Sequence, residues 1–190
     1  MSKEKILFIV NPASASGATG REWPSIRNRA ERLLGPCQVV MTMKRWDAAI
    51  HARAGITSGA GMIICLGGDG TLHEVVNGIM GENGPLNPAV PIGFIPNGTG
   101  CDFAKSLRIT EDAGRVLNLI RERRTRDVDL GKISLRSGNG HSPRFFHNIA
   151  SFGIGGDVVM RVNRGSRLIG PKATFLASAL RSVLSGKRRR

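Results

Sequence analysis

Aromatic side chains are scarce in this 190-residue chain, where they make up 5% of the sequence and include no tyrosine. Proteins that hold single-stranded nucleic acid stack its bases on several aromatic rings set among basic residues. That combination is missing, so we expect no nucleic-acid partner. Long hydrophobic runs are missing as well, since none approaches the roughly 20 residues that a membrane-spanning helix needs.

Cysteine is equally rare. The chain has three cysteines, Cys37, Cys65 and Cys101, and no Cys-x-x-Cys pair. Their spacing relative to the histidines and carboxylates does not match a structural zinc site. Polar residues at 2–5 lead directly into an apolar segment, which is unlike a signal peptide. We therefore expect reduced cysteines and a cytoplasmic protein.

Acidic residues are half as numerous as basic ones, at 14 against 28, and the formal net charge is +14. Such an excess predicts an anionic partner, either a nucleotide or an anionic membrane surface. The basic residues gather at 121–126, 161–167 and 187–190. Near an anionic leaflet each contributes about 1 kcal/mol of attraction. We expect peripheral association with the inner face of the membrane, with a merely solvated basic face as the alternative.

Strand-like and helix-like segments alternate along the first two thirds of the sequence. Apolar runs typical of buried strands precede segments with apolar residues at helical spacing. Strands are predicted at 5–10, 37–43, 62–66 and 90–95, and helices at 21–34, 46–57, 71–80, 101–106 and 111–123. This order predicts an α/β fold, with a doubly wound parallel sheet forming a nucleotide-binding domain over residues 1–125.

The pattern changes after residue 125. Strands are predicted at 128–135 and 144–152, joined by a turn at 137–140, and a helix with one apolar face at 171–184. Residues 126–190 are therefore expected to form part of a second, β-rich domain. If the apolar face of that helix is left uncovered, it favours self-association, so we expect a homodimer.

A glycine-rich loop with an acid inside it follows the strand at 62–66. Gly67, Gly68 and Gly70 allow the backbone to approach a bulky anion closely. The helix that begins after them presents free N–H groups and its positive dipole end, which favour phosphate. Asp69 lies within this loop and can bind a metal ion or accept a proton. Together these features predict a nucleotide-phosphate site.

Several of these residues have a second interpretation. Asp69 could be a turn residue that only caps the helix. Thr71 could contact a phosphate or serve as the N-cap, and its spacing from Glu74 matches a capping box. Glu74 is therefore either a capping residue or a contact to nucleotide or metal.

Two further loops also follow predicted strands. Asn11 and a Gly/Ser/Ala stretch from Ser14 follow the first strand, and Gly98, Thr99 and Gly100 follow the fourth. The carboxyl ends of parallel strands meet at one edge of a sheet, so the three loops are expected to form one site. The sequence contains neither a P-loop nor a Gly-x-Gly-x-x-Gly fingerprint.

Four segments in this order resemble the diacylglycerol kinase catalytic-domain superfamily, which includes bacterial diacylglycerol kinases and sphingosine and ceramide kinases. They are Asn-Pro at 11–12, GGDGTLHEVVNG at 67–78, GTGCDFA at 98–104 and FHNIASFG at 146–153. NAD kinases share the GGDGT core more distantly. The resemblance implies an ATP- and Mg²⁺-dependent lipid kinase that acts in phospholipid metabolism.

The resemblance also assigns roles to individual residues. Asp69 is implied as the catalytic residue and as a metal ligand, and Asp102 as a substrate contact. The implied nucleotide-binding residues are Asn11, Ser14, Gly67, Gly68, Gly70, Thr71, Glu74, Gly98, Thr99 and Gly100.

The chain departs from the family pattern in two places. Cys101 occupies a position where the family has asparagine, and the Asp-Gly-Glu segment of the family's second domain is missing. The chain is thus expected to stop just inside that domain and to lack part of the catalytic apparatus. The leading hypothesis is transfer of the γ-phosphoryl group of ATP to a diacylglycerol- or sphingoid-like lipid. The alternatives are a NAD kinase-like enzyme and a non-catalytic nucleotide- or lipid-binding module.

Overall fold

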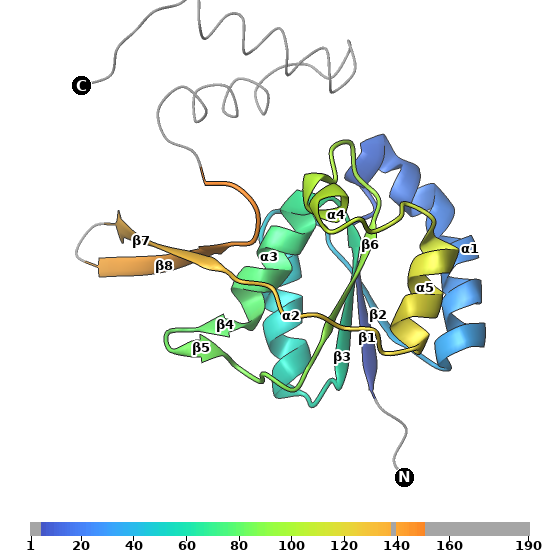
Figure 1. The fold of residues 1–190 in the computed structure, drawn as a ribbon, viewed down its shortest axis with the longest axis horizontal. Helices are drawn as coiled ribbons and strands as arrows, with labels where there is room; N and C mark the ends of the chain where they lie inside the picture. Colours follow the sequence, from blue (N-terminus) through green and yellow to red (C-terminus); the bar gives the residue numbers. More distant parts are fainter. Residues whose placement is uncertain (1–4, 138–139, 151–190) are drawn as a thin grey trace, which may run out of the picture. The chain divides into compact units, whose positions relative to one another are not determined.

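The computed structural model describes residues 5–137 and 140–150 (Figure 1). Its centre is a four-stranded parallel sheet in the order β2 (Gln38–Met41), β1 (Ile6–Val10), β3 (Met62–Gly67) and β6 (Ile92–Pro96). Every residue of β1 and β3 is buried, which matches their unbroken apolar sequence and their central position.

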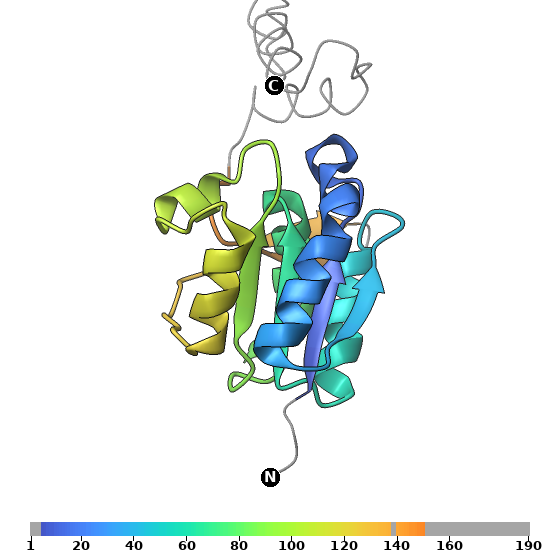
Figure 2. The same ribbon diagram turned by 90° about the vertical axis from the view of Figure 1, so that its right-hand side faces the viewer.

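Helices cover both faces of this sheet (Figures 1 and 2). Helices α1 (Ala18–Leu34) and α5 (Ala113–Arg121) pack on one face, where Phe8 and Ile64 lie in the same core as Trp23. Helices α2 (Asp47–Thr57) and α3 (Asp69–Ile79) cover the other face, against Ile9 and Cys65. The predicted doubly wound α/β fold is confirmed.

Most predicted elements lie within a few residues of the observed ones, and two helices begin earlier than predicted. Helix α1 begins at Ala18 instead of 21, which places Pro24 inside it. Helix α3 begins at Asp69 with Gly68 as its N-cap, instead of at Thr71. The capping-box prediction is therefore wrong: Thr71 is the third helical residue and cannot cap the helix.

Short elements complete the described fold. A 3₁₀ turn η1 (Ser14–Gly17) follows β1, and α4 (Asp102–Ser106) follows β6. Two antiparallel hairpins pair β4 (Met80–Gly81) with β5 (Gly84–Pro85), and β7 (Gly131–Ser137) with β8 (Gly140–Phe146). The second hairpin was predicted, although β8 begins and ends earlier than the predicted strand at 144–152.

The β7–β8 hairpin is anchored to α3 by Asn77. The Asn77 Nδ2 atom donates to the Phe145 carbonyl at 2.9 Å, and its Oδ1 accepts from the Phe145 N–H at 3.0 Å. Residues up to Asn148 accordingly form one compact unit.

The β-rich second domain over 126–190 stays a prediction, and the predicted helix at 171–184 lies outside the described residues. Among the helices within the described ranges, none has the length and hydrophobicity needed to cross a membrane.

Close packing of α2 on α3 depends on Gly78. A Cβ atom at this position would overlap the Ala49 carbonyl oxygen and lie 2.8 Å from the Ala49 Cα. We expect Gly78→Ala to lower the free energy of unfolding by about 2 kcal/mol, measured by urea denaturation, because the backbone of α2 must move. Gly70→Ala in the same helix is the control, since its Cβ would meet nothing within 4 Å. Equal stability of the two variants would contradict the expectation.

Candidate nucleotide-phosphate site

The loops after β1, β3 and β6 leave the sheet at the same edge, which is uppermost in Figure 1. Backbone hydrogen bonds extend beyond the strands and hold the loops together there. The Asn11 N–H donates to the Leu66 carbonyl at 3.0 Å, and the Asn97 N–H donates to the Gly67 carbonyl at 2.8 Å. The predicted convergence of three loops at one sheet edge is therefore present.

Asn11 links the first loop to the start of α3. Its side-chain Nδ2 donates to the Thr71 hydroxyl at 2.9 Å, and its Oδ1 accepts from the Ala13 N–H at 3.1 Å. Because Thr71 is buried and receives this bond, its hydroxyl positions the loop. The Thr71 N–H donates to the Gly68 carbonyl at 3.0 Å, so the predicted nucleotide contact would have to use the hydroxyl hydrogen of Thr71.

The loop from Ser14 is a tight left-handed turn. Ala15 and Ser16 have φ angles of 50° and 54°, and Gly17 has 84°. Such angles are costly for residues with a Cβ atom and often occur at ligand sites. The Ser14 hydroxyl lies 2.6 Å from the Thr19 hydroxyl, which donates to the Asn97 carbonyl at 3.3 Å. Thr19 and Asn97 thus tie the first loop to the loop after β6.

The two glycine loops touch each other through their backbones. A Cβ atom on Gly98 would lie 2.6 Å from the Gly68 Cα, and one on Gly67 would lie 2.6 Å from the Thr71 Oγ1. Glycine is required at these positions for close approach. Gly70 differs, because a Cβ there would meet no atom within 4 Å. Gly70 belongs to the first turn of α3, and the N–H groups at a helix N-terminus favour an anion.

Asp69 joins the glycine loop after β3 to the start of α4, which follows the glycine loop after β6. Its Oδ2 accepts from the Asp102 N–H at 2.9 Å and its Oδ1 accepts from the Phe103 N–H at 3.3 Å. The carboxylate therefore caps the N-terminus of α4, a helix other than its own. The alternative interpretation of Asp69 as a capping residue therefore agrees with these bonds, although the helix is α4 and not the one that contains Asp69. Its catalytic and metal-binding roles stay predictions.

Two carboxylates flank Gly100. A Cβ atom on Gly100 would lie 3.5 Å from the Asp102 Oδ2 and 3.8 Å from the Asp69 Oδ2. The Asp102 side chain is otherwise exposed and receives a bond of 3.1 Å from the Lys105 ammonium. Mg²⁺ is commonly held by one or two carboxylates together with phosphate oxygens and water, so this donor set fits it. Within the described residues, no group of three or more His, Cys, Asp or Glu side chains lies close enough together to hold a metal ion.

Glu74 bonds to the neighbouring helix α2. Its Oε2 accepts from the Ala48 N–H at 3.2 Å, at the start of α2. It thus acts as a capping residue, but for a neighbouring helix instead of its own.

Cys101 is buried, has a φ of 50° and directly precedes α4. Its thiol lies 3.5 Å from the Gly98 carbonyl. Burial raises the pKa of this thiol, and the Asp69 charge raises it further.

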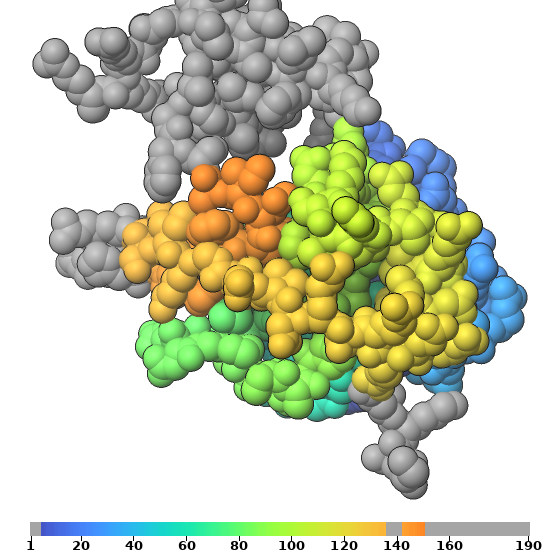
Figure 3. Space-filling view, viewed as in Figure 1, coloured from blue at the N-terminus to red at the C-terminus, as the bar shows by residue number. Residues whose placement is uncertain are grey.

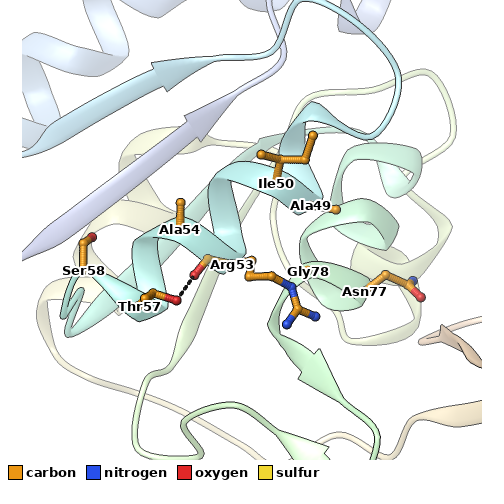
Figure 4. A pocket seen from close by; sticks show the side chains of 8 residues that line it. All are labelled: Ala49, Ile50, Arg53, Ala54, Thr57, Ser58, Asn77 and Gly78. Atoms are coloured by element: carbon orange, nitrogen blue, oxygen red, sulfur yellow. Dashed lines mark hydrogen bonds between the residues drawn. The ribbon is translucent and has the colours of Figure 1, made fainter.

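A hollow of about 680 Å³ runs along α2 and α3 and is lined by Ile50, Arg53 and Asn77 among others (Figure 4). None of the predicted site residues lines it. A smaller hollow of about 250 Å³ between α1, α5 and the end of β6 includes Asn97, whose amide donates to Glu22 at 2.7 Å.

One neighbour of the site, His147, lies in the FHNIASFG segment but was assigned no role from the sequence. His147 follows β8 and packs edge-on against Phe103, with ring centroids 4.6 Å apart. Burial lowers the pKa of its imidazole, although the nearby Asp69 carboxylate acts in the opposite direction. Its proximity arises from the β7–β8 hairpin packing on α3, which a linear pattern does not reveal.

The chain is an α/β protein of the doubly wound class, whose members bind ligands beyond the carboxyl ends of the strands, and its glycine loops and Asp69 lie at that edge. The family model of the diacylglycerol kinase catalytic domain matches residues 5–133. The chain therefore belongs to the diacylglycerol kinase catalytic-domain family, as the sequence motifs predicted.

Individual relatives agree with this assignment. A diacylglycerol kinase of Staphylococcus carnosus is 32% identical over 151 residues, which are 80% of this chain and 45% of the relative. A diacylglycerol kinase of Staphylococcus haemolyticus is 31% identical over 170 residues, covering 89% of this chain and 48% of the relative. The chain thus spans about half the length of these relatives.

A solved structure has the same fold. A diacylglycerol kinase from Bacillus anthracis str. Sterne superposes with a TM-score of 0.57 at 27% sequence identity. The matched region is 68% of this chain and 44% of that protein.

Proposed function

We propose that this chain is the nucleotide-binding part of an ATP-dependent lipid kinase, which phosphorylates the hydroxyl of a diacylglycerol- or sphingoid-like lipid. The observation that supports it best is the Asp69 carboxylate, which lies where the two glycine loops meet and bonds to the backbone of α4. Phosphoryl transfer relies on positioning and charge neutralisation, and this edge of the sheet offers both.

Each part of the site has a task in this proposal. The N-terminal N–H groups of α3 and the loop backbone at Gly68 and Gly98 hold the phosphates of ATP. Asp69 and Asp102 hold Mg²⁺, which neutralises the charge of the transferred phosphoryl group when it is bound. In the reaction, the lipid oxygen forms a bond to the γ-phosphorus, the bond from that phosphorus to the bridging oxygen of ADP breaks, and the hydroxyl proton passes to water. Both Asp69 oxygens already accept N–H bonds, which favours positioning and charge over proton abstraction.

The basic surface supports action at a membrane. Exposed basic residues gather at the end of α5 and just after it, at Arg121, Arg124 and Arg126, and this part of the chain lies at the surface in Figure 3. With a net charge of +14, the chain is attracted to an anionic leaflet. We propose peripheral binding at the cytoplasmic face, and a homodimer remains part of the proposal.

The test is a transfer assay with labelled ATP, Mg²⁺ and mixed micelles containing diacylglycerol or sphingosine, with NAD as a separate acceptor. It compares this chain with a version carried through to its natural stop codon. Labelled lipid from the longer version supports the proposal. Labelled NAD without labelled lipid would favour a NAD kinase-like enzyme. Nucleotide binding without transfer would favour a non-catalytic module.

A further inference from the structure

Five ring side chains, three aromatic and two histidine, gather in one row. Trp46 contacts His73 with ring centroids 5.9 Å apart, and His73 contacts His147 at 6.5 Å. The row continues from His147 to Phe103 at 4.6 Å and from Phe103 to Phe94 at 6.4 Å. Phe94 is buried, whereas the other four rings are partly exposed. The row therefore presents a ring-lined surface next to α4.

His147 is the polar member of this row whose bonding capacity is unused. Both of its ring nitrogens are buried, and neither has a hydrogen-bond partner in the described part of the chain. An unsatisfied buried polar group is costly, so a ligand or water that reaches it when the neighbouring rings move apart gains binding free energy. His73 differs, because its Nε2 lies 3.5 Å from the Asn77 amide.

The row passes close to Asp69 at Phe103. The Phe103 ring that packs on His147 belongs to the residue whose N–H donates to the Asp69 Oδ1. The His147 imidazole is also close enough to the Asp69 carboxylate to feel its charge. A group that bonds to His147 is therefore next to the proposed site of phosphoryl transfer, between apolar ring surfaces.

We propose that His147 hydrogen-bonds the hydroxyl-bearing headgroup of the acceptor lipid, with Phe103 and His73 as its apolar walls. A neutral imidazole offers one donor and one acceptor, which is the pairing that an alcohol needs. The ring walls suit the carbon skeleton of a glyceryl or sphingoid headgroup better than a phosphate chain. This inference rests on the proposed lipid kinase function.

Kinetics on the protein carried through to its natural stop codon test the contact. We expect His147→Ala to raise the KM for dioctanoylglycerol about tenfold, the effect of losing one hydrogen bond, and to leave the KM for ATP within about twofold. His147→Asn, which keeps a donor and an acceptor, is expected to recover most of the loss. His51→Ala on α2 is the control. An unchanged KM for the lipid, with normal folding by circular dichroism, would overturn the inference.

A second readout does not require turnover. The imidazole ¹⁵N resonances of His147, assigned by their loss in His147→Asn, are expected to shift when dioctanoylglycerol micelles are added. A shift with a non-hydrolysable ATP analogue alone would overturn the inference, as would no shift at all. If the unmodified protein phosphorylates no lipid, the proposed function fails, and the resonances still decide whether His147 contacts the acceptor.

Discussion

Asp69→Asn is expected to lower kcat for lipid phosphorylation at least about a thousandfold, because an amide cannot neutralise or hold Mg²⁺ as a carboxylate does. Asparagine also has only one oxygen, so its amide nitrogen must face one of the two α4 N–H groups that Asp69 now receives. The measurement is the transfer assay on the protein carried through to its natural stop codon, at saturating ATP and lipid.

The fall in kcat of Asp69→Asn must be distinguished from the effect of misfolding. Asp127 is exposed and lies outside the site, so Asp127→Asn is a matched control with the same change of charge. Thermal unfolding of both variants shows whether α4 remains attached. Turnover of Asp69→Asn within about tenfold of the unmodified protein, with the fold intact, would remove Asp69 from the catalytic site and with it the main support for the proposed mechanism.

Gly98→Ala is expected to weaken ATP binding by about a hundredfold or more. Its Cβ would lie 2.6 Å from the Gly68 Cα, so the two glycine loops must separate and the phosphate-binding backbone loses its geometry. Isothermal titration with ATP and Mg²⁺ measures the effect. Because the clash is between backbones, no rotamer change can relieve it.

Gly70→Ala provides the comparison. Its Cβ would meet no protein atom within 4 Å, so the loops keep their positions. If phosphates occupy the space in front of α3, the added methyl group weakens ATP binding without loss of stability. Tight ATP binding by both Gly98→Ala and Gly70→Ala would show that nucleotide binds elsewhere on the chain.

The sequence was sufficient to predict the sheet and the edge at which the loops meet. Buried parallel strands such as β1 and β3 have unbroken apolar sequences, and glycine follows β3 directly. The start of α3 was less predictable, because its N-cap Gly68 has no side chain that could form a capping hydrogen bond. The sequence therefore contains no capping residue that would mark this start. The capping-box spacing of Thr71 and Glu74 was therefore misleading.

The partners of the site residues could not be predicted from the sequence. The Asp69 carboxylate binds the backbone 33 and 34 residues further along, and Glu74 binds the backbone 26 residues earlier. His147 approaches the site through a hairpin that Asn77 holds across 68 residues. Such contacts depend on tertiary packing, and local periodicity carries no information about them.

The position of β1 at the centre of the sheet has a consequence for the order of folding. During synthesis β1 and β2 emerge first, yet β1 pairs with β3, whose residues lie more than fifty positions later. The Asp69 carboxylate finds its partners only after α4 has emerged. Non-local parallel pairing slows folding, so the newly made chain exposes apolar strands for longer than a local fold would. A ribosome-bound chain is expected to acquire nucleotide affinity abruptly, once residue 103 has left the exit tunnel.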